Sequence, residues 1–517
     1  MRVRPTAILA VATVFLLGAC SSGTSGSGST TTAATSDSAS TTTGGTGSTD
    51  PSGTTSGPAT TLPPITIPVL DWRSCGEQLE CSTITVPLDY FTPGNESISL
   101  PITRHLARNQ KRRIGSLLVN PGGPGFGGRY LAESAAAIFS PDILDRFDIV
   151  AWDPRGTGDS EPAIDCIDNY DPYFAVDPQP DTPEEKQANI ALAKQFAEAC
   201  NERSGALLAH VSTQDTARDM DLLRRSLGEE KISYFGFSYG SELGATWATM
   251  FPNTVRAAVF DGAADPNATA AQGMIDQAKG FEIALNAFLA DCVKKCAFAD
   301  GADPGTVFDD LLAQIDTNSY PTQPGRPALN LGITYTAIAD AMYATQLWPV
   351  LDEALAAARK GDGSGLLQLN DDYYHRNADG TYTNELEAFL AISCVDDRGP
   401  TTVEGVDAFN AQLEAAAPRL GVSFESGYGC VFWPVDSEPN LVVTGKGAGP
   451  ILVIGTTNDP ATPFESSQRM ARALERGIFV KVTGDGHTGY TRSNCAKKLV
   501  DKYLVKGEVP DGDVECN

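Results

Sequence analysis

The sequence predicts an α/β fold in which helices cover both faces of a mostly parallel sheet. Three observations lead to this prediction. Apolar segments typical of buried strands alternate with helical segments over residues 65–265, and again after residue 441. One apolar segment, 232–237, runs directly into a Gly-x-Ser-x-Gly motif and then into a helical pattern. The block between, 266–440, has helical spacing with little strand character, which predicts a helical cap inserted before the last core strands.

Composition limits the function classes. The chain has 517 residues, of which 41% are hydrophobic, so it is long enough to bury a large core. It carries 38 basic and 65 acidic residues, for a formal net charge of −27. Nucleic-acid binding needs a basic surface, so no nucleic-acid partner is expected. The composition carries no signature of an oligomeric state.

The N-terminus predicts export. Residues 1–19 begin with two arginines and continue as an apolar run too short to span a membrane, as in a signal peptide. Leu17-Gly-Ala-Cys20 resembles the lipobox of bacterial lipoproteins, where cleavage precedes the cysteine and lipid is added to its thiol. We therefore expect Cys20 to anchor the protein at the extracytoplasmic face of the cell membrane. The alternative is plain secretion without lipid.

Residues 20–64 are nearly all Ser, Thr, Gly, Ala and Pro. Such a segment cannot bury a core and is predicted to be a flexible tether.

The remaining ten cysteines are an even number, which indicates disulfides in an exported protein. Pairing between sequence neighbours is the simplest hypothesis, although the sequence leaves the connectivity open. The pairs are Cys75–Cys81, Cys166–Cys200, Cys292–Cys296, Cys394–Cys430 and Cys495–Cys516. The alternative for Cys292 and Cys296 is half of a zinc site. No second Cys or His pair stands nearby, so no metal is expected.

The predicted elements follow in order. Core strands are expected at 83–87, 97–103, 115–120, 147–152, 232–237 and 255–260, with core helices at 183–203 and 215–227. Cap helices are expected at 270–291, 304–316, 334–345, 350–359, 384–393 and 403–417. The C-terminal core, 441–517, contains strands at 449–455 and 479–483, the second predicted as the last strand, and a closing helix at 493–506.

Ser238 is the candidate nucleophile. It lies between a predicted strand and a predicted helix, in the sharp turn that exposes a nucleophilic serine. Gly236 and Gly240 flank it because side chains at those positions would collide with neighbouring backbone. The motif alone is common, and the strand before it and helix after it are the context it requires.

The base must follow this serine in the chain. Of the four histidines only His487 does so from a loop at the end of a core strand; structural roles are expected for the others, His105, His210 and His375.

The acid that orients His487 is predicted on the loop after the preceding strand, where Asp459 stands. Asp261, which closes an earlier strand, is the rival for this role. Asp485 is too close to His487 in sequence to orient its ring.

Two backbone N–H groups must stabilise the oxyanion. One is predicted from Tyr239, and the other from Gly122 or Gly123 in the loop after the strand 115–120. The alternative is that these glycines only form a turn. A nucleotide-binding loop would need a Walker lysine, which is missing, and no cofactor is expected.

Five motifs together resemble the tripeptidyl aminopeptidase family of actinobacteria, which has the α/β-hydrolase fold. They are Asn120-Pro-Gly-Gly-Pro-Gly, Trp152-Asp-Pro-Arg-Gly-Thr-Gly-Asp-Ser160, Gly236-Phe-Ser-Tyr-Gly240, Thr457-Asn-Asp-Pro-Ala-Thr-Pro463 and Gly486-His487. The family is allied to proline iminopeptidases and includes mycobacterial cell-envelope serine hydrolases. The resemblance spans about residues 70–517. It implies release of short peptides or single residues from N-termini through an acyl-enzyme, with Ser238, Asp459 and His487 as the triad.

The resemblance also implies that cap carboxylates hold the substrate amine. Asp396 and Asp397, at the return of the cap, are the candidates, with a solvated acidic turn as the alternative. Glu242 carries an unusual charge near the nucleophile and is expected either to bind an amine or to face solvent.

Two other functions remain open. One is a carboxylesterase or lipase acting on cell-envelope esters. The other is a catalytically inactive binding lipoprotein, which the complete triad disfavours.

Overall fold

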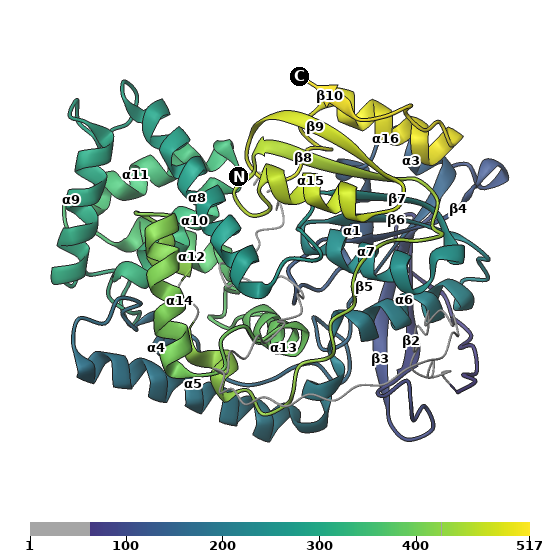
Figure 1. Cartoon of the computed structure of the whole chain (residues 1–517), viewed down its shortest axis with the longest axis horizontal. Coiled ribbons are helices and arrows are strands. Elements are labelled where there is room, and N and C mark those ends of the chain that lie inside the picture. The colour runs from purple at the N-terminus through teal and green to yellow at the C-terminus, as the bar shows by residue number, and fades with distance from the viewer. Residues whose placement is uncertain (1–62, 425–426) are drawn as a thin grey trace, which may run out of the picture.

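The structure, a computed structural model, describes residues 63–424 and 427–517. The predicted signal peptide, Cys20 and the tether up to residue 62 lie outside the described residues. The described strands form one sheet in the order β1-β2-β3-β5-β4-β6-β7-β8-β9-β10 (Figure 1). The pairs from β5 to β10 are parallel, and β1, β2 and β3 extend the sheet as an antiparallel edge.

The strands are β1 (Arg73–Gly76), β2 (Leu79–Pro87), β3 (Ser97–His105), β4 (Gly115–Asn120), β5 (Phe147–Trp152), β6 (Ile232–Phe237), β7 (Val255–Asp261), β8 (Ile451–Asn458), β9 (Gly477–Asp485) and β10 (Val514–Cys516). Every residue of β4, β5 and β6 is buried. Both faces of these central strands are covered, so their sequences are continuous apolar runs rather than alternating ones.

The core helices are α1 (Tyr130–Glu133), α2 (Ala135–Ile138), α3 (Pro141–Arg146), α6 (Thr213–Ser226), α7 (Tyr239–Met250), α15 (Phe464–Ala473) and α16 (Asn494–Lys506). The helices on the cap side are α4 (Asp171–Phe174), α5 (Pro183–Ser204), α8 (Ala270–Cys292), α9 (Pro304–Thr317), α10 (Leu331–Met342), α11 (Trp348–Ala358), α12 (Ser364–Tyr373), α13 (Glu385–Asp396) and α14 (Val403–Ala416). The cap helices gather to one side of the sheet, at the left of Figure 1, and α13 lies between them and the core helices.

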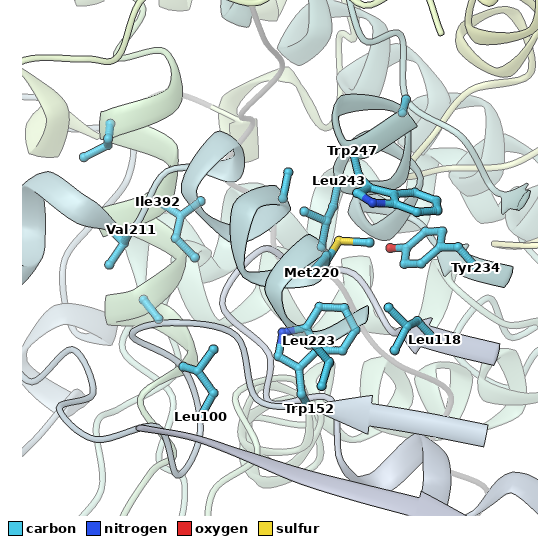
Figure 2. Close-up of a cluster of buried hydrophobic side chains, with 14 of the residues drawn as sticks. Leu100, Leu118, Trp152, Val211, Met220, Leu223, Tyr234, Leu243, Trp247 and Ile392 are labelled. Atoms are coloured by element: carbon cyan, nitrogen blue, oxygen red, sulfur yellow. The ribbon is translucent and has the colours of Figure 1, made fainter. Parts of the chain in front are cut away.

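Each face of the sheet has its own hydrophobic cluster. Successive strand residues point to opposite faces, so Leu118 and Tyr234 pack on one side while Leu117 and Phe235 pack on the other. Figure 2 shows the first cluster, where α6 and α7 contribute the side chains Met220, Leu223, Leu243 and Trp247. Ile392 of α13 joins this cluster, so the sheet side of α13 is part of the core.

The cap has a third cluster of its own, built from α8 to α14. Its most buried members include Phe281, Ile338, Leu351 and Leu366. Phe126, from the loop after β4, is also part of this cluster. The cap therefore packs directly onto the loop that the sequence assigned to oxyanion binding.

The structure contains the five disulfides expected from neighbour pairing. It also contains elements that were not expected, namely β1, α1 to α4, α12, α15 and β10. The prediction that 479–483 is the last strand was wrong, because β10 pairs in parallel with β9. β10 has only three residues, too few for a periodic pattern, and Cys516 attaches it to Cys495 in α16.

None of the described helices combines the length and the apolar character needed to cross a bilayer. The described part of the chain also holds no group of three or more His, Cys, Asp or Glu side chains arranged as metal ligands.

Candidate active site

Ser238 lies at a strained turn between β6 and α7. Its φ of 54° and ψ of −129° are unusual for a residue with a side chain. A Cβ added at Gly236 would lie 2.1 Å from the carbonyl oxygen of Gly240, and one added at Gly240 would lie 2.8 Å from Oδ1 of Asn120. Both flanking glycines are therefore required by close backbone approach, as the motif predicted.

His487 and Asp459 are in direct contact. Nδ1 of His487 lies 2.8 and 2.9 Å from the two carboxylate oxygens of Asp459. The backbone N–H groups of Ala461, Thr462 and Thr488 also donate to this carboxylate, at 3.1, 2.9 and 3.2 Å. These donors fix the orientation of the carboxylate, which in turn fixes the ring.

This contact also sets the tautomer of His487. With the Nδ1 proton donated to Asp459, Nε2 is the acceptor of the neutral ring. Nε2 is buried and has no hydrogen-bond partner among the described residues. It is therefore available to take a proton from a nucleophile or give one to a leaving group.

The rival acid, Asp261, has a different position. Its carboxylate accepts hydrogen bonds from the backbone N–H groups of Gly489 and Tyr490, at 2.7 and 2.8 Å, and not from the His487 ring. Its backbone carbonyl accepts a hydrogen bond from Ser238 N at 2.9 Å. A Cβ added at the next residue, Gly262, would lie 2.9 Å from Cε1 of His487. The nucleophile turn and the imidazole thus both lie against the end of β7.

The loop after β4, here called the oxyanion loop, differs from the expectation in which N–H groups are available. The N–H of Gly122 donates to Oδ1 of Asn120 at 3.0 Å, so it is already engaged. No described residue accepts a hydrogen bond from the N–H of Gly123 or Tyr239; Tyr239 is the first residue of α7, where helical N–H groups lack an intrahelical acceptor. A Cβ at Gly122 would lie 2.8 Å from Cβ of Ser238. Gly122 therefore allows the close approach, while Gly123 and Tyr239 have available donors.

The cap contacts His487, the candidate base, directly, which the sequence did not reveal. The backbone carbonyl of Tyr343, just after α10, accepts a hydrogen bond from His487 N at 2.9 Å. The Tyr343 ring also stands edge-on to the imidazole, with ring centroids 5.5 Å apart. Tyr343 lay within the predicted helix 334–345, and no motif marked it.

The three acidic residues predicted to bind an amine have other partners as well. Asp396 accepts hydrogen bonds from the N–H and Oγ1 of Thr213, at 2.8 and 2.6 Å, and Thr213 Oγ1 also contacts the Tyr239 hydroxyl. Burial raises the pKa of Asp396 to about 7. Glu242 is only 5% exposed, which is contrary to the solvent-facing alternative, and its charge helps to raise the pKa of Tyr239.

Asp397 accepts hydrogen bonds from the backbone N–H groups of Ala270 and Gly399, both at 3.0 Å. It also lines a cavity of about 680 Å³ between α5, α8, α13 and α14. Met274 and Phe389 line the same cavity. A Cβ added at Gly125 would lie 2.7 Å from Phe389 N, so the cavity wall reaches the oxyanion loop. The candidate triad residues, Ser238, Asp459 and His487, are not part of its lining.

A further acidic cluster of the cap lies beside the site and was missed by the sequence. His375 Nδ1 lies 2.5 Å from Oε2 of Glu385, and the His375 ring packs against Phe126 of the oxyanion loop. Asp340 precedes Tyr343 by one helical turn and is 4% exposed. Burial, with the nearby charge of Asp372, raises the pKa of Asp340 to about 7.

Comparisons with known proteins identify the family of this chain. The model of the alpha/beta hydrolase fold matches residues 115–304, and that of TAP-like proteins matches 418–516. Serine protease Hip1 of Mycobacterium tuberculosis is 36% identical over 455 residues, which are 84% of this chain and 87% of that protein. This chain belongs to the TAP-like α/β-hydrolase family. The family resemblance predicted from the five motifs is confirmed, and the chain is a serine peptidase or hydrolase.

Two further members define the range of the family. Tripeptidyl aminopeptidase of Streptomyces lividans is 30% identical, covering 86% of each chain. Carboxylesterase B of Mycobacterium tuberculosis is 35% identical, covering 88% of this chain and 91% of that protein. Relatives named for peptide hydrolysis and for ester hydrolysis are thus similarly distant from this member of the family.

Proposed function

We propose that this protein is an exported, lipid-anchored serine peptidase that removes short peptides or single residues from peptide N-termini. The observation that carries the proposal is the buried cap carboxylate of Asp340, which lies one helical turn before Tyr343, the cap residue that contacts His487. The relative named tripeptidyl aminopeptidase supports the same activity.

The proposed reaction assigns a role to each group described above. His487 Nε2 takes the proton of Ser238, whose oxygen attacks the carbonyl carbon of the scissile bond. The N–H groups of Gly123 and Tyr239 stabilise the negative oxygen of the tetrahedral intermediate. The protonated His487, stabilised by Asp459, then donates its proton to the leaving amine. Water attacks the acyl-enzyme by the same route and releases the N-terminal fragment.

The cap provides the reason to prefer chain ends. The carboxylate of Asp340 is buried, and Glu385 and Asp372 lie in the same cluster. A substrate ammonium group would donate charge-assisted hydrogen bonds to such carboxylates. Asp397, in the wall of the adjacent cavity, remains a second candidate for the same role.

Ester hydrolysis is the second candidate function. It is favoured by the apolar part of the cavity wall, where Met274, Leu386 and Phe389 would suit an acyl chain. The relative named carboxylesterase B supports this alternative.

The test compares three substrates of the full-length protein: an Ala-Pro-Ala anilide, its N-acetylated form and a nitrophenyl ester. We expect fast turnover of the anilide with the unblocked amine and at least about tenfold slower turnover of the acetylated one, because the acetylated substrate has no charge for Asp340. Asp340→Asn should raise KM for the unblocked anilide and leave ester turnover unchanged. Asp511→Asn, an exposed acid, is the control. Ester turnover without anilide turnover would establish the carboxylesterase instead.

The location has its own test. Cys20 lies outside the described residues, and the sequence motif supports its lipidation. We expect Cys20→Ser to abolish labelling by a palmitate analogue and to move the protein from the membrane to the medium. Unchanged membrane retention would contradict the anchor.

A further inference from the structure

We infer that Asp261 is a positioning residue: it fixes the histidine loop, residues 484–490, relative to the nucleophile turn and so holds His487 in place for Ser238. The inference rests on the serine hydrolase chemistry proposed above. It assigns to Asp261 a role different from the acid that orients the imidazole.

Asp261 accepts hydrogen bonds from two segments, the histidine loop and the turn that carries Ser238. Its two carboxylate oxygens accept hydrogen bonds from Gly489 N and Tyr490 N in the histidine loop. Its carbonyl oxygen accepts the hydrogen bond from Ser238 N in the nucleophile turn. Asp261 is fully buried, so water does not compete for these bonds. Ser238 and His487 are far apart in sequence. Asp261, a single residue, is hydrogen-bonded both to the backbone of Ser238 and to the backbone of the loop that carries His487.

The histidine loop needs these acceptors because of its shape. Thr488 has a φ of 66°, a left-handed conformation that turns the following N–H groups toward the end of β7. Asp459 accepts the N–H of Thr488, and Asp261 accepts the next two. Without Asp261, two buried N–H groups would lose their acceptors, which is costly and would let the loop shift. A shift of about 1 Å at a catalytic group can slow a reaction about 100-fold.

Arg492 holds the same loop by its carbonyl groups. Its guanidinium donates to the carbonyl oxygens of Thr488 at 2.9 Å and Asp485 at 2.6 Å, and also to that of Gly486. A Cβ at Gly486 would lie 2.2 Å from Nη1 of Arg492, so the glycine makes room for this contact. The loop is therefore clamped by an anion at its N–H groups and by a cation at its carbonyl groups.

The charge of Asp261 also acts on His487. Burial raises the pKa of Asp261 to about 6, while its two N–H donors and the positive charges of Arg492 and His487 oppose this rise. The carboxylate is thus mostly ionised at neutral pH. Together with Asp459, it favours the imidazolium that forms when His487 takes the serine proton. The positive charge of Arg492 acts in the opposite direction. The negative charge of Asp485 also acts on Arg492.

The test substitutes Asp261→Asn, which keeps the shape but replaces one acceptor with a donor. Glu387→Gln is the matched control, because Glu387 is also a buried carboxylate that accepts two consecutive backbone N–H groups, those of Cys166 and Ile167, both at 3.0 Å. Turnover of a nitrophenyl ester by the full-length protein is divided by the number of sites that react with a fluorophosphonate. We expect Asp261→Asn to lower kcat about 10- to 100-fold with KM within about twofold. The acidic limb of the pH–kcat/KM profile should move to lower pH.

Arg492→Gln is a second test, and it does not require a substitution at a buried position. It removes the clamp from the outer side of the loop, so kcat should fall in the same way but less. Wild-type kcat and an unshifted acidic limb in Asp261→Asn would overturn the inference, as would an equal loss in Glu387→Gln. If Asp261→Asn does not fold, wild-type kcat in Arg492→Gln would overturn it. Failure of the wild-type protein to turn over the ester or react with the fluorophosphonate would instead refute the proposed function.

Discussion

The backbone carbonyl of Tyr343 accepts a hydrogen bond from the backbone N–H of His487 at 2.9 Å, and the Tyr343 ring stands edge-on to the imidazole. A residue at the end of a cap helix thus holds His487, the proposed catalytic base, from outside the core. The cap of this hydrolase therefore contributes contacts to the candidate active site.

Replacing Tyr343 separates the two contacts. The hydrogen bond uses the backbone, so Tyr343→Phe should keep both it and the edge-on packing. Tyr343→Ala removes the ring and leaves a cavity beside His487, and we expect kcat to fall about tenfold or more because the imidazole gains freedom. Steady-state kinetics on the nitrophenyl ester measures both variants. Equal kcat in Tyr343→Ala and wild type would show that the ring does not position the base.

Removing the nucleophile and the base tests whether they act together. Ser238→Ala and His487→Ala should each lower kcat by at least about 10³-fold, and the double variant should lose little more, because triad members act as a unit. Fluorophosphonate labelling should disappear in Ser238→Ala. Persistent labelling, or losses that multiply in the double variant, would contradict the assignment of this pair.

The oxyanion loop predicts a steric effect. Gly122 has a φ of 109°, and a Cβ there would lie 2.8 Å from Ser238 Cβ and from the Phe237 carbonyl oxygen. Gly122→Ala should therefore displace the loop, and with it the N–H of Gly123, lowering kcat about 100-fold as expected for the loss of one oxyanion donor. Gly94→Ala, where no atom lies within 4 Å of the added Cβ, is the control. Full activity in Gly122→Ala would place the oxyanion site elsewhere.

The buried Asp340 predicts a pH dependence of stability. Its pKa is raised from 3.8 to about 7, mainly by burial and then by Asp372, while His375 opposes the rise. The folded state therefore binds the proton more tightly than the unfolded state does. The resulting contribution of Asp340 to the free energy of unfolding is fully present below about pH 4 and is lost as pH rises through about 7. Its loss is worth roughly a few kcal/mol.

We therefore expect the wild-type Tm to fall between pH 5 and pH 8, and Asp340→Asn to fall less, as measured by calorimetry across this range. Burial also raises the pKa values of Asp396 and Glu387 to about 7, so part of the pH dependence of Tm should persist in Asp340→Asn. Parallel Tm curves for Asp340→Asn and wild type would show that Asp340 does not carry this contribution.

The sequence alone predicted the fold, which the structure confirms, and a candidate triad in the order Ser238, Asp459, His487. Apolar runs such as that of β6 and helical spacing such as that of α8 are local patterns, because burial on both faces or on one stripe leaves a fixed period in the chain. Ser238 and His487 could be predicted because each stands in a glycine-flanked segment at the end of a strand. The family's chain order, serine before acid before histidine, also fits these two residues.

Contacts between distant segments were decided only by the tertiary structure. No local pattern could show that Asn120 takes the N–H of Gly122, that Asp261 binds the histidine loop, or that Tyr343 of the cap holds His487. The choice between Asp459 and Asp261 also needed the fold, because both aspartates end neighbouring parallel strands and only the path of the loop places one of them at the ring. A sequence records which residues can do the chemistry, and packing determines which of them reach it.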